Sequence, residues 1–103
     1  MSNKPTIKLK DYDPIDFLES PEDMASYIDA AIQENDAGLL ISALNDVARA
    51  YGVNRLAEEI GVNRESLYKS LNGSVMPRFD TIYKALNVLG LQMSVRPIQQ
   101  SAK

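Results

Sequence analysis

The side chains best suited to chemistry in this 103-residue chain lie close together, between positions 63 and 69. Arg64 can pair bidentately with the edge of a guanine, Glu65 can accept a hydrogen bond from cytosine N4, and Lys69 can reach a guanine or a phosphate. Asn63 and Tyr68 stand beside them on the same stretch. These residue types predict direct reading of bases in a DNA groove. Simple solvated charges are the alternative interpretation, above all for Glu65.

Histidine and cysteine are absent from the chain, and their absence excludes several other kinds of site. Without them there is no thiol nucleophile, no disulfide, no histidine acid–base chemistry and none of the usual ligands of zinc, copper or haem. Paired carboxylates remain the one available catalytic route, and no glycine-rich phosphate loop accompanies them. We therefore expect no enzymatic activity, no metal and no cofactor.

A second group of residues could hold DNA phosphates, through backbone N–H groups at helix starts and through nearby cations or amides. Its members are Asn54, Arg55, Ser66 and Arg78. Arg55 could instead pair with Glu58 or Glu59 on its own helix. Because so few cations are available, one copy would bind DNA weakly. We therefore expect a homodimer that reads two half-sites one helical turn apart.

The residues around Gly61 predict a helix-turn-helix, which would position Arg64 in the major groove. Two helices that cross steeply through a short turn need a residue that accepts a positive φ, and Gly61 supplies it. They also need a small residue where they touch, and Ala57 supplies it. Asn54 is expected to cap the first helix, over 55–60, and Asn63 the second, over 64–71. The inward positions are apolar: Leu56, Ile60, Val62, Leu67 and Leu71.

Three further helices are expected to support this pair. The first begins at Ser20-Pro21 and ends near Asn35, with an apolar stripe of Met24, Tyr27, Ile28, Ala31 and Ile32. The second begins at the cap Asp36 and ends at Gly52, with a stripe of Leu40, Ala43, Leu44, Val47, Ala48 and Tyr51. The last follows Pro77 and ends at Gly90, with a stripe of Phe79, Ile82, Tyr83, Leu86 and Leu89.

Two segments show the alternation of apolar and polar residues that is typical of strands. Leu91–Val95 predicts a short C-terminal β-strand closed by Pro97, and residues 6–10 alternate weakly. A lone strand leaves its backbone groups unpaired, so it must pair with residues 6–10, with its copy in a dimer, or with a partner's edge. We divide the chain into an acidic N-terminal arm over 1–19, a helix-turn-helix domain over 20–97 and a flexible tail over 98–103.

Charge is distributed unevenly along the chain. Residues 1–36 hold three lysines and nine acidic residues, a net charge of −6, whereas residues 37–103 have a net charge of +3. This asymmetry suggests two faces for two partners, although a solvated acidic terminus would show it too. A basic protein would complement the acidic segment, with Ile15, Phe17 and Leu18 as candidate contacts. Phe17 and Leu18 could equally close the chain's own core.

The chain has no apolar run of about 18 residues, which a membrane-spanning helix would need. Its N-terminus has no apolar segment of the kind found in signal peptides. We therefore expect a cytoplasmic protein with no membrane partner.

Residues 53–90 resemble the phage-repressor type of helix-turn-helix domain. About 12–95 resembles the addiction-module antidote proteins, which are antitoxins encoded beside toxins of the RelE/ParE superfamily. The segments that carry this second resemblance are Asp16–Leu18, Tyr27–Ala31, Leu44–Ala50, Arg64–Leu71 and Pro77–Ile82. The resemblance implies an all-α, five-helix phage-repressor-like fold, to which the predicted C-terminal strand would be added.

The resemblance also implies two activities: neutralisation of a RelE/ParE-like toxin by direct binding, and repression of the chain's own operon by promoter binding. By analogy with repressors, base contacts fall on Arg64, Glu65 and Lys69, and phosphate contacts fall on Asn54, Ser66 and Arg78. A stand-alone prophage-type repressor without a toxin is the main alternative, and an interaction module that has lost DNA binding is another. The long acidic N-terminal region departs from a plain repressor and favours a partner-binding role.

Overall fold

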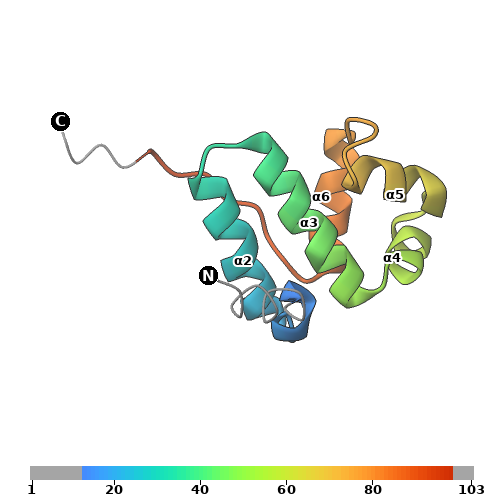
Figure 1. The fold of residues 1–103 in the computed structure, drawn as a ribbon, viewed down its shortest axis with the longest axis horizontal. Coiled ribbons are helices and arrows are strands. Elements are labelled where there is room, and N and C mark those ends of the chain that lie inside the picture. The colour runs from blue at the N-terminus through green and yellow to red at the C-terminus, as the bar shows by residue number, and fades with distance from the viewer. Residues whose placement is uncertain (1–12, 99–103) are drawn as a thin grey trace, which may run out of the picture.

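The computed structural model describes residues 13–98, and their regular structure is helical throughout (Figure 1). A short 3₁₀ helix, η1 (Pro14–Phe17), precedes five α-helices: α2 (Pro21–Gln33), α3 (Ala37–Tyr51), α4 (Val53–Ile60), α5 (Arg64–Leu71) and α6 (Phe79–Val88). The prediction of an all-α fold with five helices is confirmed. No helix within residues 13–98 has the length and apolar character needed to cross a membrane. The weak strand pattern over 6–10 lies outside the described residues.

Side-chain caps begin three of the helices where the sequence predicts them. The Ser20 hydroxyl accepts a hydrogen bond from the Asp23 backbone N–H at 3.1 Å, which begins α2. Asp36 and Asn63 cap α3 and α5 in the same way, each accepting from two backbone N–H groups. Because such caps satisfy otherwise unpaired donors of the first turn, the helix starts follow from local sequence.

The start of α4 differs from the prediction that Asn54 caps it. The helix begins at Val53, directly after Gly52, and no side chain caps it. Gly52 has a φ of 111°, and it is the single residue through which α3 turns into α4. Val53 is thereby buried, and Asn54 lies exposed in the first turn of α4.

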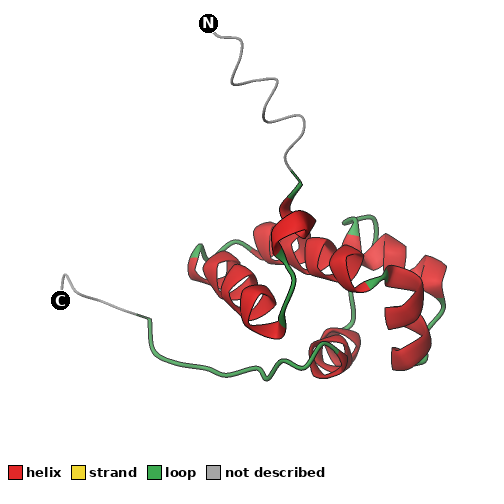
Figure 2. Cartoon of the chain, turned by 90° about the horizontal axis from the view of Figure 1, so that it is seen from below, coloured by secondary structure: helices red, strands yellow, loops and turns green. Residues whose placement is uncertain are grey.

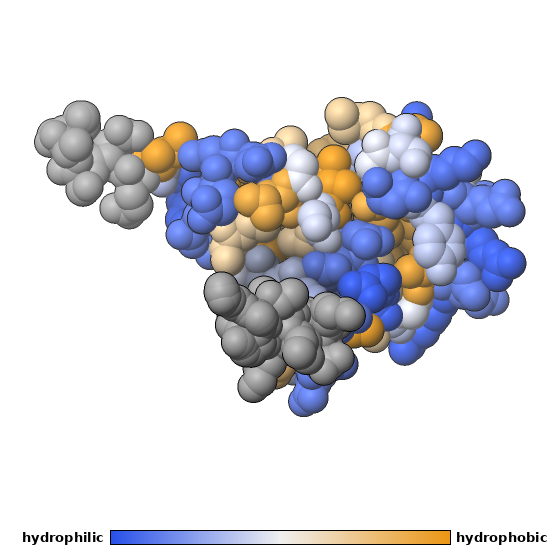
Figure 3. Space-filling view, viewed as in Figure 1, coloured by the Kyte–Doolittle hydropathy of each residue, from blue (hydrophilic) through white to orange (hydrophobic). Residues whose placement is uncertain are grey.

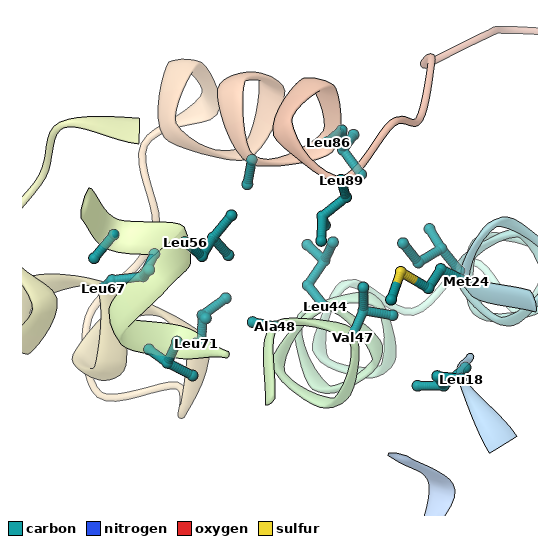
Figure 4. Close-up of a cluster of buried hydrophobic side chains, with 14 residues drawn as sticks. Leu18, Met24, Leu44, Val47, Ala48, Leu56, Leu67, Leu71, Leu86 and Leu89 are labelled. Atoms are coloured by element: carbon teal, nitrogen blue, oxygen red, sulfur yellow. The ribbon is translucent and has the colours of Figure 1, made fainter. Parts of the chain in front are cut away.

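A single core cluster joins the five α-helices and Leu18, which directly follows η1 (Figure 4). The central helix α3 contacts η1, α2, α4 and α5, and α4 also contacts α5 and α6. Leu56 on α4 and Val47 on α3 are the largest fully buried side chains of the described region. The cluster consists of Leu18, Met24, Ile28, Leu44, Val47, Ala48, Val53, Leu56, Ala57, Leu67, Leu71, Ala85, Leu86 and Leu89.

Some positions of the predicted apolar stripes do not face this core. Phe79 is 66% exposed and Tyr83 is 49% exposed, so their assignment to the core is wrong. The buried side of α6 is formed by Ala85, Leu86 and the following Leu89, with Ile82 partly buried beside them. Ile32 on α2 is likewise exposed. These helices carry more apolar surface than the core can cover, and periodicity alone does not say which part is covered.

The predicted C-terminal strand is not formed. Residues 91–98 follow α6 as an extended loop (Figure 2), and no described segment pairs with them as a strand. The Leu91 N–H donates to the Leu86 carbonyl at 2.8 Å, and farther along Arg96 Nη2 lies 2.8 Å from Asp29 Oδ1 on α2. The alternating pattern therefore corresponds to extended backbone, because strand structure requires a neighbour with which to exchange hydrogen bonds.

Candidate nucleic-acid interface

The turn between α4 and α5 has the backbone geometry predicted for Gly61. Gly61 has a φ of 90° and a ψ of 32°, in the left-handed region. Its N–H and that of Val62 both donate to the Ala57 carbonyl, at 2.9 and 3.0 Å, which ends α4. A Cβ at position 61 would meet no atom within 4 Å, so the backbone angle rather than crowding favours glycine. Only residues 61–63 separate the end of α4 from the start of α5.

The inner side of this helical pair is apolar and closely packed. Ala57, the small residue predicted at the point of contact, is buried together with Leu56. Leu67 and Leu71 fix α5 to the core, and Ile60 and Val62 are partly buried against it. The two helices are therefore distinct, and the orientation of α5 is set by its leucines.

The outer side of α5 is polar and exposed, and the helix lies at the edge of the molecule (Figure 1). Arg64, Glu65 and Lys69 point to solvent, and their side chains form no ion pair with another described residue. Tyr68 is about half exposed between them. Asn63 uses its side-chain oxygen to accept from the N–H groups of Glu65 and Ser66, at 2.8 and 3.2 Å. The predicted base-reading side chains thus share one accessible face.

Two of the phosphate candidates are paired with carboxylates inside the chain. Arg55 Nε lies 3.5 Å from Glu59 Oε2, and its guanidinium lies 4.1 Å from the centre of the Tyr51 ring. The Tyr51 hydroxyl also donates to Glu59, and this hydrogen bond raises the pKa of Tyr51. The structure therefore contains the Arg55–Glu59 ion pair, which was the alternative to a phosphate contact by Arg55.

Arg78 lies immediately before α6 and pairs with Asp80 through two contacts, of 3.0 and 3.4 Å. These hydrogen bonds raise the pKa of Arg78 and lower that of Asp80. Arg55 and Arg78 are both exposed, but each would have to leave its carboxylate partner in order to bind a DNA phosphate. On α5 itself, Arg64 and Lys69 form no ion pair with a described residue.

A surface groove brings several of the predicted residues together beside α5. Asn63, Ser66 and Lys69 line it from the helix, and Arg78 lines it from the loop that follows. The exposed Asn54 and Arg55 do not line it. The groove is also lined by Val62 and Leu67, which were predicted as inward-facing positions, and by Ser70, Val75, Met76 and Thr81, which sequence reasoning missed. The turn residues near Gly73 could have indicated these positions, because a turn after α5 brings the following residues back alongside that helix.

The three residues that were predicted to contact a partner protein differ in their exposure. Leu18 is 7% exposed and belongs to the core, Phe17 is 62% exposed, and Ile15 is intermediate. Phe17 and Ile15 therefore lie on the surface of η1, while Leu18 anchors the following residues to the helices.

A network of polar contacts holds η1 on α3. Arg49 donates to both Asp13 and Asp46, with Nη2–Oδ1 distances of 3.2 and 3.0 Å. Asp13 also accepts from the Ile15 N–H, and the Arg49 hydrogen bond lowers the pKa of Asp13. The Tyr27 hydroxyl donates to Asp46 at 2.6 Å. Sequence reasoning missed this network, because Asp13 and Tyr27 are far from their partners Arg49 and Asp46 in the chain.

Comparison with known proteins gives two matches that cover nearly the whole chain. A family model described as "Probable addiction module antidote protein" matches residues 8–97. An uncharacterized protein of Haemophilus influenzae is 40% identical over 91 residues, which make up 88% of this chain and 94% of that protein. No solved structure matches the chain. The region matched by the family model includes η1 and all five described α-helices.

Proposed function

The chain belongs to the family of probable addiction module antidote proteins, and we propose that it is the antitoxin of a type II toxin–antitoxin module. In this proposal it neutralises a RelE/ParE-like toxin by direct binding and represses its own operon by sequence-specific DNA binding. The observation that carries the DNA-binding part is the exposed outer face of α5, with Arg64 and Lys69 free of ion pairs within the described region. A homodimer would present this face twice.

DNA recognition would follow from the direction of α5. With its N-terminal turn in the major groove, Arg64 would donate to guanine and Glu65 would accept from cytosine, flanked by Asn63 and Tyr68. Lys69, one turn farther on, would contact a base or a phosphate. Further phosphate contacts would come from Ser66 and Arg78 beside the groove and from Asn54 and Arg55 near the start of α4.

Toxin binding would use the opposite half of the chain. Residues 13–52 contain nine acidic residues and Arg49 as their sole cation. A toxin that engages nucleic acid is expected to be basic, and complementary charge speeds association and disfavours wrong partners. Phe17 and Ile15 would supply apolar contacts within this acidic surface, held in place by the buried Leu18.

The DNA-binding proposal is tested by titrating the purified protein against the duplex upstream of its own gene and against a scrambled duplex. Arg64→Ala should weaken binding to the first by about 1–3 kcal/mol and relax the preference at one base pair. Arg96→Ala is the matched control, because Arg96 is exposed but pairs with Asp29 on α2. Equal affinity for the two duplexes, or an Arg64→Ala protein with unchanged affinity and specificity, would refute the assignment.

The toxin-binding proposal is tested by co-expression with the product of the neighbouring reading frame. Phe17→Ala should lower the affinity for that protein and the rescue of growth while leaving operator binding unchanged, because the side chain is exposed. Deleting residues 1–19 is a less informative test, because it also removes Leu18 from the core. Operator binding without any rescue by the parent protein would instead favour a stand-alone repressor.

A further inference from the structure

Residues 91–98, which we call the C-terminal segment, run from the end of α6 past α2 as extended chain (Figure 2). The Leu91 N–H donates to the Leu86 carbonyl, and Arg96 is held by its ion pair with Asp29 of α2. Between these two points, no backbone N–H or carbonyl of residues 92–95 forms a hydrogen bond with another described residue. The segment therefore resembles the free edge of a sheet, to which another strand can be added.

An apolar groove of about 380 Å³ adjoins the C-terminal segment. This volume is many times the ~30 Å³ that one water molecule occupies in the liquid, so the groove is more than a packing defect. Gln92, Met93 and Ser94 of the segment line it, together with apolar side chains of three helices, which are Ile28, Ile32, Leu40, Leu44, Ile82 and Leu86. A strand added to the segment would thus find an apolar groove beside it for its side chains.

The C-terminal segment also carries apolar side chains that the described chain leaves uncovered. Val95 is 94% exposed, the largest fraction among the exposed large hydrophobic residues of the described region, and Met93 is 37% exposed. The two positions are two residues apart, so in a strand their side chains would lie on the same face. A neighbouring strand would cover both through cross-strand side-chain pairs.

We propose that an edge strand of the toxin pairs with residues 92–96 and places apolar side chains in the adjoining groove. This inference rests on the proposed toxin-binding function, and it adds a second contact to that of Phe17 and Ile15 on η1. Hydrogen bonds between the two backbones would supply affinity, and the groove would select the apolar side chains of the added strand.

Charge favours a basic toxin over the other candidate occupants. The adjoining helix α2 carries Glu22, Asp23 and Asp29 and no basic residue, and within the described residues only Asp29 of these three has an ion-pair partner. A basic partner is attracted to such a surface, whereas DNA phosphates are repelled by it. A second copy paired at the same segment would bring its own acidic α2 beside the first, and like charges would repel.

Hydrogen exchange tests the backbone contact directly. Full-length, isotope-labelled protein is measured alone and in complex with the unlabelled product of the neighbouring reading frame. Because residues of a paired strand bond alternately to their neighbour, exchange should slow by about tenfold or more at every second N–H within residues 92–96. The N–H groups of Ser74 and Val75 are the internal control, because they already donate to the Lys69 carbonyl and should not change.

A matched pair of side-chain variants tests the apolar contact. Val95→Ser should weaken binding of the same partner by about tenfold, because a valine that the partner buries is lost, and should leave operator binding unchanged. Val75→Ser is the control and should bind the partner like the parent. Val75 is also an exposed valine, but it lies in the loop between α5 and α6, where apolar atoms appear at the top of the molecule (Figure 3). Neither valine belongs to the core, so the circular dichroism of both variants should match the parent.

The results that would overturn the proposal differ from those that would overturn the proposed function. The proposal fails if the complex forms but the N–H groups of residues 92–96 exchange as in the free protein, or if Val95→Ser binds as tightly as the parent. It also fails if these N–H groups become protected in the protein alone as its concentration rises, because the occupant is then a second copy. A complex held through η1 would survive each of these results. If the parent forms no complex at all, the toxin-binding function itself fails, and this inference fails with it.

Discussion

The two halves of the molecule differ in charge although they share one core. In residues 13–52, which form η1, α2 and α3, nine acidic residues accompany a single arginine. In residues 53–98, six basic residues accompany four acidic ones. Arg49, the cation of the first half, is held between Asp13 and Asp46, whereas Arg64 and Lys69 of the second half pair with no described carboxylate. The acidic half thus binds its cation internally, whereas Arg64, Lys69 and Lys84 of the second half form no ion pair with a described residue.

This difference gives the two halves chemically distinct surfaces. Leu56 of α4 and Val47 of α3 meet in the shared core, so neither half has an independent interior. The halves therefore differ in their surfaces, which carry carboxylates and Phe17 on one half and the polar outer face of α5 on the other. Substitutions in each half can test whether the halves unfold as one unit and bind different partners.

Leu56→Ala has the largest expected effect. The side chain is 1% exposed, so its truncation should lower the free energy of unfolding by about 2–5 kcal/mol. Urea unfolding followed by circular dichroism measures this loss, with the exposed Ile32→Ala as control, for which a much smaller change is expected. Because the core is shared, the variant should still unfold in one transition. Two separate transitions would show that the halves are independent domains.

The helix caps offer a matched pair, one in each half. Ser20→Ala and Asn63→Ala should each reduce the free energy of unfolding by about 1 kcal/mol, because each removes an acceptor for first-turn N–H groups. Only Asn63→Ala should also weaken operator binding, since it loosens the start of α5. The measurements are urea unfolding and DNA titration under identical conditions. An equal loss of DNA affinity in both variants would contradict the separation of the two binding surfaces.

The salt dependence of operator binding should distinguish the two kinds of cation. If Lys69 contacts a phosphate, Lys69→Ala should reduce the slope of log K against log salt by about 0.9. Arg78→Ala should reduce the slope by less, because Arg78 exchanges its pairing with Asp80 for the phosphate contact. Titrations over a range of salt concentrations measure both slopes, with Arg96→Ala as control. A parent-like slope for Lys69→Ala would remove that residue from the phosphate contacts.

Acidification should have the smallest effect, confined to exposed ion pairs. The hydrogen bond from Arg49 lowers the pKa of Asp13, so the folded state binds fewer protons than the unfolded state near the ordinary carboxyl range. This contribution to stability is present above the unfolded pKa, about 3.9, and is lost as pH falls through the lowered folded value. Asp13→Asn should therefore lose stability at neutral pH and flatten the acid dependence slightly.

The control for this pH experiment is Asp16→Asn, because the Asp16 carboxylate forms no ion pair with another described residue. Urea unfolding of the parent and both variants between neutral pH and pH 2 gives the comparison. If the Asp13→Asn protein matches the parent at every pH, the Arg49 network does not stabilise η1.

Features that depend on a few neighbouring residues could be predicted from the sequence. Ser20, Asp36 and Asn63 begin their helices because a short polar side chain reaches N–H groups two or three positions ahead. Gly61 ends α4 because its own positive φ sets the direction of the turn. The buried face of α5 and its exposed outer face follow from helical periodicity once these ends are known.

Features that depend on what lies opposite a residue were decided by the tertiary structure alone. Phe79 and Tyr83 satisfy the helical period as well as core residues do, yet α6 turns Ala85 and Leu86 inward in their place. Residues 91–98 remain a loop because no described strand lies beside them. Arg49 reaches Asp13 at a separation of 36 residues. The chain's local preferences are short-range, whereas burial and ion pairing depend on which surfaces meet when the helices pack.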